Sequence, residues 1–137
     1  MTAPVLTQRA VFYAANKTIR FPKTTEGEKL KYRYVVKNTG KAPLEFYGFE
    51  AECTCTDVTL PKESIKPGDQ AFIDVVFDTN GKYYFQDRII YLSTNTQKKR
   101  EKLRFKVFVT PKDWLLYSKY WTLFFKLALP LLSYESI

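Results

Sequence analysis

The sequence contains two cysteines, Cys53 and Cys55, with one residue between them. Side chains two positions apart in a strand point to the same side, so this pair could share a soft metal such as copper or close into a small-ring disulfide. A structural role is the alternative, because half-buried thiols pack as small hydrophobic groups. The nearby acidic residues Glu50, Glu52 and Asp57 disfavour the thiolate that a reactive cysteine needs. A copper- or thiol-handling module therefore stays open as one hypothesis for function.

The sequence of 137 residues contains no histidine. This absence excludes histidine-based catalysis and the common zinc sites, and a total of two cysteines excludes a disulfide-rich scaffold. Acidic residues such as Asp74, Asp78 and Asp87 form no recognisable acid–base motif, and no glycine-rich loop could cradle a phosphate. We therefore expect no enzymatic activity, no catalytic residue and no cofactor.

Basic residues exceed acidic ones by 22 to 14, which gives a formal net charge of +8. Residues 113–137 contain two lysines and two acids, so the whole excess belongs to residues 1–112. Nine bases form a candidate basic face: Lys29, Lys31, Arg33, Lys98, Lys99, Arg100, Lys102, Arg104 and Lys106. Such a face could contact anionic lipid headgroups or nucleic acid, or be a solvated surface. The lack of a recognition helix, zinc module or RNA-binding aromatic motif argues against nucleic acid.

Alternating polar and apolar residues predict seven or eight short strands before residue 112, and no helix. The expected ranges are 11–13, 18–21, 29–36, 44–49, 57–60, 71–77, 85–93 and 103–109. Turn residues separate them, and Asn38-Thr39-Gly40 is expected to reverse the chain because Asn and Gly tolerate positive φ. The regular spacing predicts an all-β sandwich over residues 1–112.

Six short landmarks occur in order along these strands. They are Gly27-Glu28, residues 34–44 (YVVKNTGKAPL), Cys53-Thr54-Cys55-Thr56, residues 65–69 (IKPGD), residues 76–79 (VFDT) and Ser93-Thr94-Asn95. Over about residues 17–110 the chain thereby resembles a bacterial family, domain of unknown function 1573. The resemblance implies an immunoglobulin-like antiparallel sandwich, related to Hydin-like and major sperm protein-like domains, without enzymatic activity. Members are frequent in cell-envelope proteins. The chain departs from the family in having Thr54 where glycine is usual, no visible export signal and a hydrophobic tail.

Residues 113–137 have a different pattern, which predicts a hydrophobic, amphipathic helix. Pro111 can start this helix and Pro130 can kink or end it. The polar residues near its middle share one narrow stripe, and nearly all other positions are apolar. We expect the tail to dock on a membrane or a partner through Trp114, Tyr117, Lys119, Tyr120, Trp121, Phe124, Phe125 and Lys126.

The tail could engage a membrane in more than one way. As a helix, residues 113–134 would extend roughly 30 Å, about the thickness of the hydrocarbon core. Lysine near the centre costs about 2.5–3.5 kcal/mol, so spanning is marginal, and an interfacial helix fits equally well. Folding back onto the sandwich is the third arrangement. The bases between Lys98 and Lys112 slightly favour the cytoplasmic face, with the periplasmic face as the alternative. The leading hypothesis is a non-enzymatic accessory subunit of a membrane protein complex.

Overall fold

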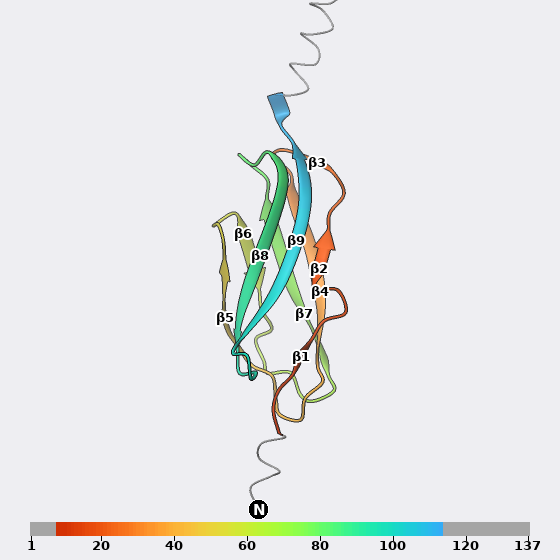
Figure 1. Ribbon diagram of the computed structural model, residues 1–137, viewed down its shortest axis with the longest axis vertical. Helices are drawn as coiled ribbons and strands as arrows, with labels where there is room; N and C mark the ends of the chain where they lie inside the picture. The colour runs from red at the N-terminus through yellow and green to blue at the C-terminus, as the bar shows by residue number, and fades with distance from the viewer. Residues whose placement is uncertain (1–7, 114–137) are drawn as a thin grey trace, which may run out of the picture.

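Two β-sheets packed face to face form the fold in the computed structural model, which describes residues 8–113 (Figure 1). Sheet A has the order β1-β4-β7-β6, with β1 (Phe12–Tyr13), β4 (Lys29–Asn38), β7 (Gln70–Asp78) and β6 (Thr56–Thr59). Sheet B has the order β2-β9-β8-β5, with β2 (Thr18–Arg20), β9 (Arg100–Thr110), β8 (Tyr84–Thr94) and β5 (Phe46–Ala51). The short β3 (Thr24–Thr25) also pairs with β9. Every element between residues 8 and 111 is a strand, which confirms the all-β sandwich.

The core lies between the sheets and follows the alternation in the sequence. In β7 the side chains of Ile73, Val75 and Phe77 are buried, and in β9 those of Leu103, Phe105, Val107 and Val109 are buried. Because successive side chains in a strand point to opposite faces, the residues between them form the outer faces of the sheets. The outer face of β9 is therefore available for charged side chains.

Tyr34 of β4 connects the two sheets. Its side chain is 1% exposed, and its hydroxyl donates a hydrogen bond of 2.8 Å to the backbone carbonyl of Arg104 in β9. Burial, with a smaller contribution from Tyr32, raises the pKa of this phenol. Tyr34 thus contributes both an aromatic ring to the core and a polar link that fixes the position of sheet A relative to β9.

The start of the chain divides between the two sheets. β1 pairs antiparallel with β4, whereas β2 and β3 pair parallel with β9. The other pairings are antiparallel, so the expectation of an antiparallel sandwich holds for most of the fold and is wrong for these two strands. The strand β3 adds a ninth strand to the expected seven or eight, and at two residues it is too short to produce a periodic pattern.

The Asn38-Thr39-Gly40 segment does reverse the chain, but positive φ is not the reason. Neither Asn38 nor Gly40 has positive φ. Asn38 is fully buried at the end of β4, and its side chain makes four hydrogen bonds with the backbone of Val11, Gly40, Ala42 and Ile65. A Cβ at Gly40 would lie 2.0 Å from the carbonyl oxygen of Arg9, so this position requires glycine because the backbones approach closely. The segment holds three loops together at this end of the sandwich.

Candidate docking surface

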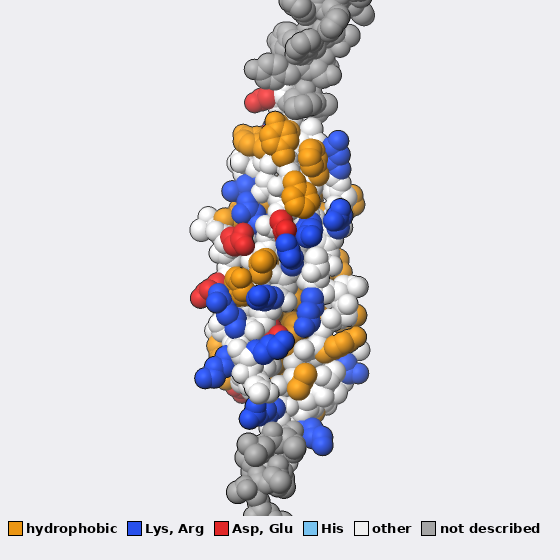
Figure 2. Space-filling model, viewed as in Figure 1, with side chains coloured by type: hydrophobic (Ala, Val, Ile, Leu, Met, Phe, Trp, Pro, Cys, Tyr) orange, Lys and Arg blue, Asp and Glu red, His pale blue; other side chains and the backbone are white. Residues whose placement is uncertain are grey.

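Four basic side chains form a row on the outer face of β9. Arg100, Lys102, Arg104 and Lys106 alternate with the buried residues of this strand, and we call them the β9 row. At about 6.7 Å for every two residues, the row extends about 20 Å along sheet B. Arg20 of β2 lies opposite Lys106 in the register and widens the row. Figure 2 shows basic side chains distributed over this face.

The first half of the β9 row is organised by Tyr91 of β8. The guanidinium carbon of Arg100 lies 3.9 Å from the centroid of the Tyr91 ring, and Nζ of Lys102 lies 5.7 Å from it. Arg100 also forms a salt bridge of 2.5 Å with Glu50 of β5. These contacts hold Arg100 over sheet B, while Lys102 forms no salt bridge within the described part of the chain.

The second half of the β9 row is organised by Asp87 of β8. Arg104 binds both carboxylate oxygens of Asp87, with a distance of 2.7 Å from Nε to Oδ1. These hydrogen bonds, with the charges of Arg104 and Lys106, hold the pKa of Asp87 below its ordinary value against a smaller opposing effect of desolvation. Asp87 likewise raises the pKa of Arg104. Lys106 forms no salt bridge among residues 8–113, so the lysines of the row are its unpaired charges.

The structure divides the remaining bases of the expected basic face. Lys29, Lys31 and Arg33 are exposed on β4 and therefore lie on the outer face of sheet A, on the opposite side of the sandwich. Lys98 and Lys99 belong to the turn between β8 and β9. Arg33 is also paired, because it forms a two-pronged salt bridge with Asp74 of β7 at 2.8 and 3.2 Å. One continuous face containing all nine bases is therefore not formed.

The residues of the expected tail lie outside the described part of the chain. They are Trp114, Tyr117, Lys119, Tyr120, Trp121, Phe124, Phe125 and Lys126. The expected helix and its docking role therefore remain predictions. Within residues 8–113 there is no helix long and apolar enough to cross a membrane.

An exposed aromatic cluster, which the sequence analysis missed, lies where β9 leads toward the tail. Tyr83, Tyr84, Phe85 and Phe108 are between 41% and 56% exposed, and we call them the aromatic end. Phe85 and Phe108 are cross-strand neighbours, and the rings of Tyr84 and Phe108 lie 6.3 Å apart. Figure 2 shows hydrophobic side chains gathered at this end of the molecule. Three consecutive aromatic residues at the start of a strand were the available signal.

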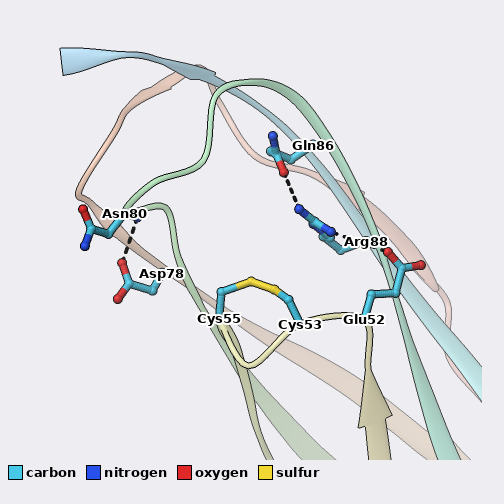
Figure 3. The surroundings of a disulfide bond; sticks show 7 residues. All are labelled: Glu52, Cys53, Cys55, Asp78, Asn80, Gln86 and Arg88. Atoms are coloured by element: carbon cyan, nitrogen blue, oxygen red, sulfur yellow. Dashed lines mark hydrogen bonds and ion pairs between the residues drawn. A yellow bond between two sulfur atoms is a disulfide. The ribbon is translucent and has the colours of Figure 1, made fainter. Parts of the chain in front are cut away.

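Cys53 and Cys55 form a disulfide in the loop between β5 and β6 (Figure 3). Their Cα atoms are 5.2 Å apart, within the usual range for disulfides. Because the two sulfur atoms are bonded to each other, neither is a thiolate ligand for copper in this state. Within residues 8–113 no group of three or more Cys, Asp or Glu side chains could hold a metal ion. Of the alternatives that the sequence left open, the structure has the small-ring disulfide.

Arg88 of β8 lies beside this disulfide loop. It contacts Glu52 at 3.6 Å and donates a hydrogen bond of 2.6 Å to the side chain of Gln86. Its Nε atom is buried and has no hydrogen-bond partner among residues 8–113. These contacts orient the Arg88 side chain between β8 and the end of β5.

A family comparison explains the order of the sequence landmarks. The model of the family described as "Protein of unknown function (DUF1573)" matches residues 12–109. The chain belongs to the DUF1573 family. Within this DUF1573 domain, Asn38 and the Cys53–Cys55 disulfide are two of the landmarks that carried the resemblance. No curated protein matches the sequence.

Solved structures similar to the DUF1573 domain share its sandwich at low sequence identity. A protein of unknown function from Porphyromonas gingivalis W83 is 17% identical with a TM-score of 0.65, over 74% of this chain and 48% of that protein. The chain therefore spans about half the length of this relative. The ASH/PapD-like domain 7 of human CEP192 is 12% identical (TM-score 0.54, covering 77% and 86%), and the E. coli chaperone DraB is 13% identical (TM-score 0.51, covering 75% and 56%). These similarities establish an immunoglobulin-like, PapD-like fold.

Proposed function

We propose that this chain is a non-enzymatic accessory module that docks on a membrane or membrane protein complex through residues 113–137 and binds an acidic partner through the β9 row. The observation that supports binding of an acidic partner is the ordered row of positive charge on the outer face of sheet B. Two of its members are neutralised by Glu50 and Asp87, whereas Lys102 and Lys106 form no salt bridge within the described residues. Arginines held in place beside unpaired lysines suit the carboxylates of a protein partner.

The fold supports a binding role by analogy alone. DraB is described as a chaperone, and a chaperone acts by binding another protein. Sandwiches of this kind carry many different functions, so the analogy indicates the mode of action and not the partner. The position of the β9 row supports the proposal further, because the same strand that carries the row leads to the tail at its end. Docking through the tail would bring the row close to the membrane.

The experiment compares three forms of the full chain in native membranes. Removal of residues 113–137 should release the protein into the soluble fraction; persistence in the membrane fraction would contradict docking through the tail. Lys102→Glu with Lys106→Glu should leave membrane association unchanged and abolish co-purification of the partner in mild detergent. Lys29→Glu with Lys31→Glu is the matched control on sheet A and should retain the partner. Equal partner recovery from both double variants would contradict binding through the β9 row.

The disulfide is relevant to the side of the membrane on which the domain lies. Disulfides persist in oxidising compartments and are rare in the cytosol, so the Cys53–Cys55 bond supports the periplasmic face. The bases before the tail support the cytoplasmic face, and the two arguments oppose each other. Because the disulfide is a covalent feature and the charge bias is slight, we propose the periplasmic face. Thiol alkylation in intact cells tests this, since fully reduced cysteines would indicate the cytoplasm.

A further inference from the structure

The backbone at Tyr84 breaks the alternation of β8 and exposes an aromatic run. Tyr84 has φ of 64°, in the left-handed region that residues other than glycine rarely adopt. Its register partner Val109 is fully buried, so a regular strand would turn Tyr84 toward the core. Tyr84 is instead 51% exposed, beside Tyr83 at 48% and Phe85 at 56%. The folded chain therefore has an unfavourable backbone conformation at Tyr84, and three successive aromatic side chains are in contact with solvent.

The aromatic end exposes a larger area than a single exposed aromatic residue would. Phe108 of β9 completes it, and with about 200 Å² for a whole aromatic side chain the four residues expose about 400 Å². This area is that of the largest apolar patch on a typical soluble monomer, and such a patch is often a binding site. A stable dimer needs about 800 Å² on each partner, about twice this area, so a second copy of the chain is a poor occupant.

Lysines lie beside the aromatic end. Nζ of Lys23 lies 5.3 Å from the centroid of the Phe108 ring. Lys82 immediately precedes Tyr83, and Lys112 follows β9. Aromatic rings with lysines beside them match the boundary between acyl chains and anionic headgroups.

The carboxylate of Glu26 fixes the loops of this end together. It accepts hydrogen bonds from the backbone N–H of Gly81 at 3.0 Å and of Lys112 at 3.2 Å. The loop that carries Tyr83 is thereby tied to the segment through which β9 leads to residue 113. A docked tail would consequently bring the aromatic end, rather than another part of the sandwich, to the surface on which the tail docks.

We propose that the aromatic end is a second lipid contact, which seats the sandwich on an anionic bilayer with its rings at the level of the acyl chain boundary and its lysines among the headgroups. This proposal rests on the proposed docking through the tail and specifies its surface as lipid. Residue 113, where the tail begins, follows β9 at the same end of the sandwich as the aromatic end, so the two contacts would act together and set the orientation of the domain.

The experiment measures partition of the full chain onto vesicles of phosphatidylcholine with and without phosphatidylglycerol. Phe85→Ser with Phe108→Ser should weaken partition onto the anionic vesicles by about tenfold or more, because both outward-facing rings lose their contact with lipid. Tyr47→Ser with Phe72→Ser is the matched control, since these rings are 67% and 51% exposed elsewhere on the sandwich. The control should partition as the unaltered chain does, and circular dichroism should show the same fold for all three.

The possible outcomes distinguish failure of the proposed lipid contact from failure of the proposed function. If the Phe85/Phe108 variant partitions as the control does, while removal of residues 113–137 abolishes partition, then the tail docks alone and the aromatic end is not a lipid contact. If that variant loses a protein partner but keeps its partition, the occupant is a protein and the proposal is wrong. If the intact chain binds neither kind of vesicle, lipid docking by both segments is refuted, whereas partner binding through the β9 row is unaffected.

Discussion

Replacement of Asn38 should destabilise the domain more than any replacement of an exposed asparagine. The Asn38 side chain uses its full capacity of two donors and two acceptors. Its amide nitrogen donates to the carbonyl oxygens of Ala42 and Ile65 at 2.7 and 2.9 Å, and its oxygen accepts from the N–H groups of Gly40 and Val11 at 2.9 and 3.2 Å. At a net contribution of about 0.5–1.5 kcal/mol for each of the four bonds, Asn38→Ala should lower the free energy of unfolding by about 4 kcal/mol.

Asn38→Asp distinguishes the hydrogen bonds that the Asn38 side chain donates from those that it accepts. The carboxylate has nearly the shape of the amide and keeps both acceptors, but it turns an oxygen toward the two carbonyl oxygens that need a donor. A buried negative charge facing carbonyl oxygens is also unfavourable, so this isosteric change should cost at least as much as the alanine change. The prediction therefore depends on hydrogen-bond direction and not on volume.

Urea unfolding followed by far-UV circular dichroism measures these changes. Asn16→Ala is the control, because Asn16 is exposed and its side chain forms no hydrogen bond within the described residues. The midpoint should fall for both Asn38 variants with the slope unchanged, and should stay constant for the control. A loss below about 1 kcal/mol for Asn38→Ala, or wild-type stability for Asn38→Asp, would refute the assignment of Asn38 as the anchor of these loops.

Three further predictions concern the disulfide and two polar links. Reduction of Cys53–Cys55 should lower the free energy of unfolding by only about 1.6 kcal/mol, because the loop it closes has three residues; a larger loss would mean that it does more than close this loop. Arg104→Gln should raise the pKa of Asp87 toward its ordinary value in a carboxyl NMR titration. Since the folded pKa is lowered, the contribution of this pair is present at neutral pH and is lost as the pH falls below about 4, and an unchanged titration would contradict the pairing. Tyr34→Phe should cost about 1 kcal/mol in urea unfolding, and it should also remove the alkaline loss of stability expected above about pH 10, where ionisation of this phenol favours the unfolded chain.

Periodicity was sufficient to predict the long strands. The buried positions of β7 and β9 are those that alternation indicates, because a two-residue period determines which side chains face the core. The two-residue β3 and the parallel direction of β2 were not predictable. A strand of two residues is too short to show a period, and periodicity carries no information on strand direction. The family resemblance, in contrast, was confirmed over residues 12–109.

The candidate surface was only partly predictable for a related reason. Alternation placed Arg104 and Lys106 on one face of their strand. It carried no information on which strands share a sheet, so Lys29 and Lys31 were grouped with bases that lie on the opposite side. The aromatic end was missed because the left-handed conformation of Tyr84 breaks the alternation on which the analysis depended. Asn38 was recognised as a turn residue, whereas its buried hydrogen bonds depend on contacts distant in sequence.

Parallel pairing between the first strands and β9 has a mechanical consequence. The N–H groups of Arg104, Phe21 and Glu26 donate across this pairing to the carbonyl oxygens of Lys17, Lys106 and Thr110. In Figure 1 the described chain starts at one end of the sandwich and leaves it at the other. A pulling force along this axis would load these bonds in shear, all together, instead of opening them one at a time. We expect single-molecule stretching across residues 8 and 113 to show one abrupt rupture, and gradual yielding at low force would contradict this geometry. An anchored tail would then transmit tension into the strongest direction of the domain.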